Sequence, residues 1–197
     1  MKKLLFLALS FVAVSAFAQG YKPGDKARDF SLKNVDGKNV SLADYTNAKG
    51  FIVIFTCNHC PYAVAYQDRI NALNVKYAVL DYPVIAINPN DSTAIPIDSY
   101  SNMQARAKEK GFTFPYLVDG TQEIAKTYGA AHTPHAYVLQ KVNGALIVKY
   151  IGAIDDNTYN ESAVKQKYVE LAVDALLAGK DVTISFTKAI GCTIKWK

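Results

Sequence analysis

Two stretches of the chain are continuously apolar and rich in β-branched residues, and they predict the centre of a sheet. Residues 51–56 (FIVIFT) and 83–88 (PVIAIN) lack the polar alternation of a half-exposed strand, which is typical of strands covered on both faces. Residues 30–42 (FSLKNVDGKNVSL) instead alternate apolar and polar positions around Asp36-Gly37. This pattern predicts a hairpin near the start of the folded domain.

Helix-period segments alternate with these strands. The predicted helices cover residues 61–77, 100–110, 121–128 and a last segment that begins at Asn160 or Ser162 and ends at Gly179. The last helix is expected to bury one apolar stripe, made of Val164, Tyr168, Leu171, Ala172 and Ala175.

Two further strand segments complete the pattern. Residues 114–119 (FPYLVD) form a short apolar run, and residues 135–152 read as a second hairpin with its turn at Asn143-Gly144. Strands that alternate with helices imply an α/β domain, with a mainly parallel sheet, helices on both faces and an antiparallel pair at the end.

The N-terminal segment has the features of a secretory signal peptide. Lys2 and Lys3 precede an apolar run over residues 4–17, and Ala16-Phe17-Ala18 is a small-x-small cleavage site. An uncleaved anchor is disfavoured because no stop-transfer pattern follows. We therefore expect residues 1–18 to be removed, the protein to be periplasmic or secreted, and no stable membrane anchor to remain.

The charge of the chain argues against nucleic-acid binding. The formal net charge is +5, with 22 Lys and Arg residues against 17 acidic residues. Loss of Lys2 and Lys3 with the signal peptide lowers this charge to about +3. The basic residues form no cluster interleaved with aromatic residues, so the chain has no nucleic-acid footprint.

Cys57 and Cys60 form a CxxC pair directly after a predicted central strand. Such a pair can be a structural disulfide, half of a metal site or a redox catalyst, and a static disulfide here would close too small a loop to stabilise a domain much. Pro61 suits a first helical turn. If the helix begins near residues 58–61, its N-terminus stabilises a Cys57 thiolate, which makes Cys57 the exposed attacking thiol and Cys60 the resolving thiol, one turn inward.

Three histidines extend the possible chemistry. His59 lies between the two cysteines, where a positive charge would lower the pKa of Cys57 and shift the couple toward the oxidising side. His132 and His135 form an HxxH pair, and with Cys57 and Cys60 they offer an alternative zinc or copper site.

Three segments resemble the thioredoxin-like superfamily, in its exported branch of redoxins related to alkyl hydroperoxide reductase and thiol-specific antioxidant. They are KPGDKARDFSL, FTCNHCPY and AHTPHAYVL, and the resemblance covers roughly residues 21–178. It implies a thioredoxin-like fold, a central mixed sheet flanked by helices, with an N-terminal β-hairpin and an insert over residues 90–111. It also implies that Thr133-Pro134 is a cis-proline loop over the CxxC pair, whose Thr133 backbone pairs with a substrate chain.

The activity that this resemblance implies is thiol–disulfide exchange without a cofactor. Its partners would be protein or small-molecule thiols and disulfides and an upstream redox partner. The strand before the CxxC pair lacks the buried acid of thioredoxin, for which Asp91, Asp98, Asp119 or Glu123 are the candidate replacements.

Two neighbouring branches of the superfamily fit less well. The peroxidase signature of a proline and a threonine before the cysteine is replaced by Gly50 and Ile54, and none of Arg28, Arg69 and Arg106 lies near the cis-proline loop in sequence. A thiol peroxidase therefore remains the first alternative. Copper chaperones of this fold space their cysteines by three residues, so a copper- or zinc-binding chaperone is the second.

The third cysteine, Cys192, lies in a C-terminal tail that matches no part of the family. The predicted organisation is therefore a signal peptide over 1–18, a redoxin domain over 19–180 and a tail over 181–197. An odd number of cysteines leaves one thiol without a permanent partner. Cys192 is a candidate third redox thiol, a handle for a reductase or an inert thiol.

Overall fold

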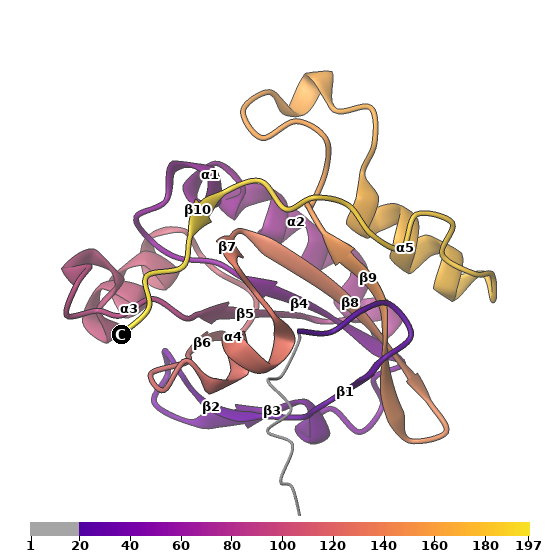
Figure 1. Ribbon diagram of the computed structural model, residues 1–197, viewed down its shortest axis with the longest axis horizontal. Helices are drawn as coiled ribbons and strands as arrows, with labels where there is room; N and C mark the ends of the chain where they lie inside the picture. Colours follow the sequence, from indigo (N-terminus) through magenta and orange to yellow (C-terminus); the bar gives the residue numbers. More distant parts are fainter. Residues whose placement is uncertain (1–19) are drawn as a thin grey trace, which may run out of the picture.

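The computed structural model describes residues 20–197, and the predicted signal peptide lies outside them. Eight strands form one sheet in the order β1-β9-β8-β4-β5-β6-β2-β3 (Figure 1). Their bounds are β1 (Lys26–Ala27), β2 (Ser31–Asn34), β3 (Asn39–Ser41), β4 (Gly50–Phe55), β5 (Val84–Asn88), β6 (Tyr116–Val118), β8 (His135–Val142) and β9 (Ala145–Gly152). Two short strands, β7 (His132–Thr133) and β10 (Cys192–Thr193), pair with each other outside this sheet.

The sheet is mixed, with β4 at its centre. β4 is buried along its whole length, runs parallel to β5 and is antiparallel to β8. β5 and β6 form the other parallel pair, and the hairpins add antiparallel strands on both sides. The expectation of a mainly parallel sheet therefore holds only for β4, β5 and β6, because antiparallel neighbours need no crossover helix.

Helices cover both faces of the sheet. They are α1 (Pro61–Ala65), α2 (Gln67–Tyr77), α3 (Tyr100–Glu109), α4 (Glu123–Tyr128) and α5 (Tyr168–Leu177). Ile52 and Ile54 of β4 belong to a core cluster with α2, α3 and α5, whereas Val53 and Phe55 belong to a second cluster with α4. Because alternate residues of a strand point to opposite faces, one apolar strand anchors both layers.

Two helices differ from the sequence prediction. The segment 61–77 is interrupted at Tyr66, where α1 ends and α2 begins. The last helix begins at Tyr168, after a separate turn over Glu161–Ala163. Its buried side chains are Val169, Ala172, Val173 and Leu176, and Leu171 is 49% exposed. The predicted stripe was right for Ala172 and for Tyr168, which packs half-buried against the core, and wrong for Leu171, which faces away from the core, and for Val164, which precedes the helix.

The tail over residues 181–197 crosses the molecule from α5 toward α1 and β7 (Figure 1).

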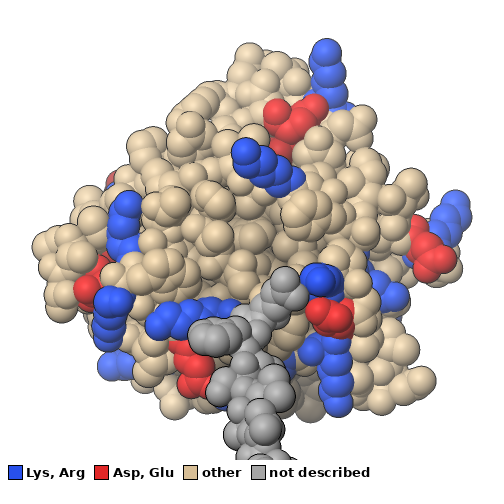
Figure 2. All heavy atoms as spheres, in the orientation of Figure 1, with Lys and Arg blue, Asp and Glu red and all other residues tan. Residues whose placement is uncertain are grey.

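Among the helices of residues 20–197, none has the length and the apolar character that a membrane span requires. On the face shown in Figure 2, the charged side chains lie mainly around the edge and the centre is largely uncharged.

Candidate active site

The CxxC pair lies in the loop between the central strand and the first helix. β4 ends at Phe55 and α1 begins at Pro61, the predicted first-turn proline. Cys60 is the N-cap of α1, so Cys57 lies three residues before the helix cap. The sequence interpretation of Cys57 at the helix N-terminus, with Cys60 one turn inward, was therefore wrong: Cys60 caps the helix, and Cys57 lies in the loop before it.

Both thiols converge on Thr133. The Thr133–Pro134 peptide bond is cis, as predicted. Cys57 Sγ lies 3.1 Å from Thr133 Oγ1, and Cys60 Sγ lies 3.0 Å from the Thr133 carbonyl oxygen. Thr133 itself is fully buried. The cis-proline loop and the CxxC pair, 73 or more residues apart in sequence, therefore form one site.

The tail closes this site. Cys57 and Cys60 are 1% and 0% exposed, so the predicted exposure of Cys57 is not observed. Cys192 lies above them, with its Sγ 2.6 Å from Cys60 Sγ, and its backbone N–H donates to the same sulfur at 3.3 Å. Because Cys192 is half-buried, it is the most accessible of the three thiols.

The two thiols of the CxxC pair differ strongly in acidity. The hydrogen bond to Cys60, burial and the negative charge of Asp98 raise the pKa of the Cys57 thiol well above its usual range. Hydrogen bonds from Cys57, from Cys192 and from the backbone N–H of Ala63 lower the pKa of Cys60 to about 4. With the tail docked, the shared proton of the pair is therefore held on the Cys57 side.

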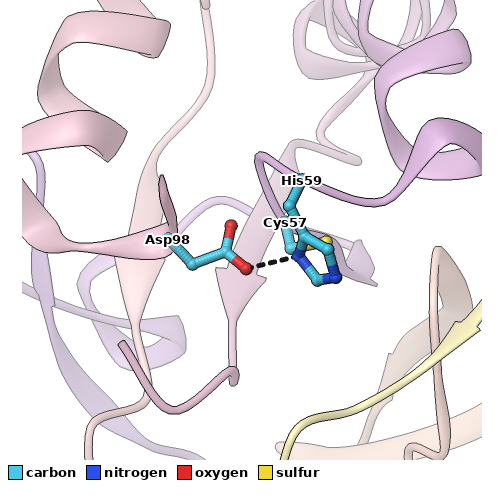
Figure 3. Close-up of side chains that lie close together, drawn as sticks. All are labelled: Cys57, His59 and Asp98. Atoms are coloured by element: carbon cyan, nitrogen blue, oxygen red, sulfur yellow. Dashed lines mark hydrogen bonds and ion pairs between the residues drawn. The ribbon is translucent and has the colours of Figure 1, made fainter. Parts of the chain in front are cut away.

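The half-buried His59 pairs with the buried Asp98, from the insert between β5 and β6. His59 Nδ1 lies 2.6 Å from Asp98 Oδ2, and Figure 3 shows both groups beside Cys57. The carboxylate also accepts the backbone N–H of Asn58 at 2.6 Å and the side-chain amide of Asn90 at 2.8 Å. Asp98 is 1% exposed, and these donors satisfy its charge.

Asp98 is therefore the acid beside the thiols, among the four candidates from the sequence. Asp91 accepts hydrogen bonds from Thr93, Asp119 caps α4 through the N–H of Ala125, and Glu123 pairs with Arg28 at the surface. The sequence could not separate these four, because Asp98 reaches the site through a loop that follows a different strand.

The four residues of the predicted metal alternative do not gather. Within residues 20–197, the metal-ligand candidates that cluster are Cys57, His59 and Asp98, which excludes Cys60, His132 and His135. His135 instead packs against the Tyr137 ring at 4.8 Å and accepts the N–H of Ala131. Burial and the charge of His132 lower the pKa of His135 to about 4.

The remaining cluster has the geometry of a hydrogen bond. Two ligands of one tetrahedral metal ion at ordinary bond lengths lie roughly 3.3 Å apart, whereas His59 Nδ1 and Asp98 Oδ2 are separated by 2.6 Å. A hydrogen bond accounts for that separation, so these residues form a hydrogen-bonded pair beside the thiol.

Three residues of the site carried no signal in the sequence. Asn58 accepts the hydroxyl of Tyr116 at 3.0 Å and donates to the carbonyl of Ile97 at 3.0 Å, and Asn90 connects Asp98 to the tail through Lys195. Gly191 lies so close to Thr133 that a Cβ atom there would be 2.2 Å from the Thr133 carbonyl oxygen. An asparagine or a glycine in a loop is too common to indicate such a role.

Sequence relatives of this chain carry two kinds of name. A Mycobacterium tuberculosis protein assigned to the peroxiredoxins is 27% identical over 148 residues, which cover 72% of this chain and 87% of that protein. The thiol–disulfide oxidoreductase ResA of Bacillus cereus is 26% identical over 145 residues, covering 70% of this chain and 79% of ResA.

Solved structures agree on the fold. A conserved protein from Geobacillus kaustophilus superposes with a TM-score of 0.82 at 38% identity, covering 96% of this chain and 98% of that one. A Chlorobium tepidum protein assigned as the thiol:disulfide interchange protein DsbE gives a TM-score of 0.61 at 19% identity, covering 79% and 98% of the two chains. The second match supports the thioredoxin-like fold alone.

The model of the AhpC/TSA family matches residues 23–172, which include the CxxC pair, the Asp98 loop and the cis-proline loop. The chain therefore belongs to the AhpC/TSA family, a redoxin family of the thioredoxin-like superfamily.

Proposed function

We propose that the protein is an exported thiol–disulfide oxidoreductase that works through the Cys57/Cys60 couple. The observation that carries the proposal is the convergence of both thiols on Thr133, at 3.1 and 3.0 Å, beside a cis-proline. A dithiol that can close to a disulfide beside a strand that pairs with one extended segment is suited to exchange with an extended chain, once that segment moves away. The name of the ResA relative supports the same reaction.

The proposed reaction needs no reactant other than the two cysteines of the pair and the substrate disulfide. Once the tail has moved, the His59 imidazole takes the proton of Cys57. The Cys57 thiolate then attacks one sulfur of a substrate disulfide, a Cys57–substrate bond forms, and the other substrate sulfur leaves as a thiolate. Cys60 then attacks Cys57, so the Cys57–Cys60 disulfide forms and the first substrate sulfur leaves. The same steps run in reverse oxidise a substrate dithiol. Either direction requires the tail to move, because both thiols are buried beneath it.

The His59–Asp98 pair is suited to handle the proton of Cys57. Cys57 Sγ, a ring nitrogen of His59 and a carboxylate oxygen of Asp98 all lie within 4.8 Å of one another. The imidazole can take or return the thiol proton while the carboxylate, held by the Asn58 N–H, fixes the ring. Asp98 is therefore proposed as a positioning residue in place of the missing strand acid.

A disulfide-exchange assay tests the proposal. Insulin reduction and oxidation of a dithiol peptide should both be lost in Cys57→Ser and in Cys60→Ser. Val79→Ser, at a side chain that is 81% exposed in the turn after α2, should retain both activities. Exchange that survives Cys57→Ser at the original rate contradicts the mechanism.

Peroxide reduction is the second candidate, and the name of the Mycobacterium tuberculosis relative favours it. The contacts of the arginines speak against a peroxide-polarising group at the thiols. Arg28 pairs with Glu123, Arg69 with Asp155, and Arg106 with Gln67 and Glu109. Hydrogen peroxide consumed by the reduced protein as fast as disulfides are exchanged would identify a peroxidase instead.

The proposed location is the periplasm or the extracellular medium. The basic start, the apolar run and the small-x-small site over residues 1–18 support it. Cell fractionation and N-terminal sequencing of the purified protein test this proposal, with Gln19 as the expected first residue. A protein that retains Met1 would contradict cleavage.

A further inference from the structure

The C-terminal tail is fixed along the molecule before it reaches the active site. Thr187 donates its N–H to the carbonyl oxygen of Ile151 at 3.0 Å, and its hydroxyl lies 2.6 Å from the Tyr150 hydroxyl. Gly152 packs so closely on Thr187 that a Cβ atom there would be 2.2 Å from Thr187 Oγ1. The tail is therefore guided to the site rather than placed there by its last residues alone.

At the site, the tail occupies the open edge of β7. Cys192 is the antiparallel partner of Thr133, Thr193 is the partner of His132, and Ile194 donates its N–H to Ala131 at 3.1 Å (Figure 1). Ile194 is 3% exposed and belongs to the core cluster that contains α4. An unpaired strand edge accepts any extended chain of suitable shape, so the tail holds the place that an external chain would need.

The residues after β10 also fix the tail in its docked position. The backbone of Lys195 bonds to Asn90 and Asp91 of the insert, and Gln122 bonds to the backbones of Lys195 and Lys197. Asn90 also donates to Asp98 at 2.8 Å. The docked tail is therefore connected to the same loop that supplies the acid of the site.

The docking sets one sulfur contact in particular. Cys192 Sγ lies 2.6 Å from Cys60 Sγ, a small displacement from a disulfide bond of about 2.05 Å. Cys57 Sγ instead contacts the hydroxyl of Thr133. The Cys192 thiol thus contacts Cys60 of the CxxC pair. Cys192 is also the only one of the three thiols that is half-buried rather than buried.

We propose that Cys192 is a third redox-active thiol, which exchanges with the Cys57–Cys60 disulfide at Cys60 and thereby carries the disulfide toward the surface. This inference rests on the proposed exchange function of the CxxC pair. The Cys192 thiolate, after losing its proton to solvent, attacks Cys60 Sγ; the Cys60–Cys192 bond forms and the Cys57–Cys60 bond breaks. Cys57 leaves with the electron pair and takes up a proton, so the protein keeps the same oxidation state.

The Cys60–Cys192 disulfide is suited to attack from outside. An external thiolate can reach Cys192 Sγ, forming a mixed disulfide there, while Cys60 leaves as a thiolate. The N–H groups of Cys192 and Ala63 stabilise that leaving sulfur, and a leaving thiol of low pKa departs faster. The buried pair therefore exchanges electrons with a partner that never reaches Cys57.

Trapping of disulfides in variants that each lack one of the three cysteines tests the pairing. Cys57→Ser treated with oxidised glutathione should form the intramolecular Cys60–Cys192 disulfide, found by acid quench, alkylation and peptide mapping. Cys60→Ser should form Cys57–Cys192 at least about tenfold more slowly, since proximity sets the effective concentration of the two thiols. A matched control carries Cys192→Ser and Thr193→Cys in the Cys57→Ser protein, which moves the thiol to the other face of β10 and should slow closure by a similar factor.

Wild-type protein provides a measurement that needs no variant. Oxidised wild type, quenched in the same way, should contain both the Cys57–Cys60 and the Cys60–Cys192 disulfides. Wild type with Cys57–Cys60 alone, together with a Cys57→Ser variant that keeps Cys60 and Cys192 unlinked, overturns the inference. Insulin reduction by the same wild-type sample then still supports the proposed function, whereas its absence would remove that function independently.

Discussion

Asp98 and His59 form a hydrogen-bonded pair beside Cys57, with Asp98 Oδ2 at 2.6 Å from His59 Nδ1. The sequence interpretation considered the histidine alone and expected its positive charge to favour the Cys57 thiolate. The structure adds a carboxylate whose charge raises the pKa of Cys57. This carboxylate opposes the effect that the sequence interpretation expected of the histidine, so the motif by itself does not set an oxidising potential.

Replacement of this carboxylate should make Cys57 more acidic. Asp98→Asn removes a negative charge next to Cys57, and we expect the pKa of Cys57 to decrease and the couple to become more oxidising. Iodoacetamide alkylation of Cys57 as a function of pH, in a protein that also carries Cys60→Ser and Cys192→Ser, measures the pKa. Equilibration of the three-cysteine protein with glutathione measures the potential.

A surface aspartate controls for this change. Asp68 is 84% exposed in its side chain, so Asp68→Asn should leave the alkylation profile of Cys57 unchanged. A Cys57 profile that moves to higher pH in Asp98→Asn would show that the loss of His59 positioning outweighs the loss of repulsion.

Acid should destabilise the protein through His135. The unfolded chain binds a proton at this residue below pH 6.5, whereas the folded protein binds it only at about pH 4, because burial disfavours the charged ring. Protonation therefore favours the unfolded state, and the free energy of unfolding should decrease by about 2 kcal/mol between pH 7 and pH 5 from this residue.

Urea unfolding at the two pH values checks this decrease. In His135→Gln the difference between pH 7 and pH 5 should be smaller by about 2 kcal/mol than in the wild type, even if the variant is less stable at both values. His132→Gln, at a half-buried neighbour, should keep most of the difference. An unchanged difference in His135→Gln would show that another group causes the acid sensitivity.

Much of the active-site framework follows from local sequence. The β-branched run of β4, the helix-compatible Pro61 and the proline before β8 all have local signatures, and the structure has each of them where the sequence indicates. The position of Asp98 does not, because residues 39 apart are joined by a loop whose path depends on tertiary contacts. The docking of the tail is also non-local, since a two-residue strand is stable only with its partner.

The buried Arg69–Asp155 ion pair should contribute far more to the free energy of unfolding than the exposed Arg28–Glu123 pair. Their side chains are 11% and 5% exposed, and Arg69 also donates to the backbone carbonyls of Asn157 and Thr158. Arg69→Leu leaves Asp155 buried without its partner, and we expect a loss of about 3 to 5 kcal/mol in the free energy of unfolding. Arg28→Leu, which breaks an ion pair with both side chains 58% exposed, should cost less than about 1 kcal/mol. Urea unfolding at neutral pH compares the two variants, and equal losses would contradict the difference in burial.

A methyl group at Gly191 should undock the tail and open the active site. Its Cβ would lie 2.2 Å from the carbonyl oxygen and 2.6 Å from the carbonyl carbon of Thr133. The atoms that this Cβ would meet belong to the backbone and cannot move aside like a flexible side chain, so Gly191→Ala must separate β10 from β7. We expect alkylation of Cys57 and Cys60 in the reduced protein to become at least about tenfold faster, which corresponds to a loss of about 1.4 kcal/mol in docking. Gly120→Ala is the matched control, because a Cβ there meets no atom within 4 Å, and it should alkylate at the wild-type rate. If Gly191→Ala is alkylated no faster than this control, the tail is not what limits access to the thiols.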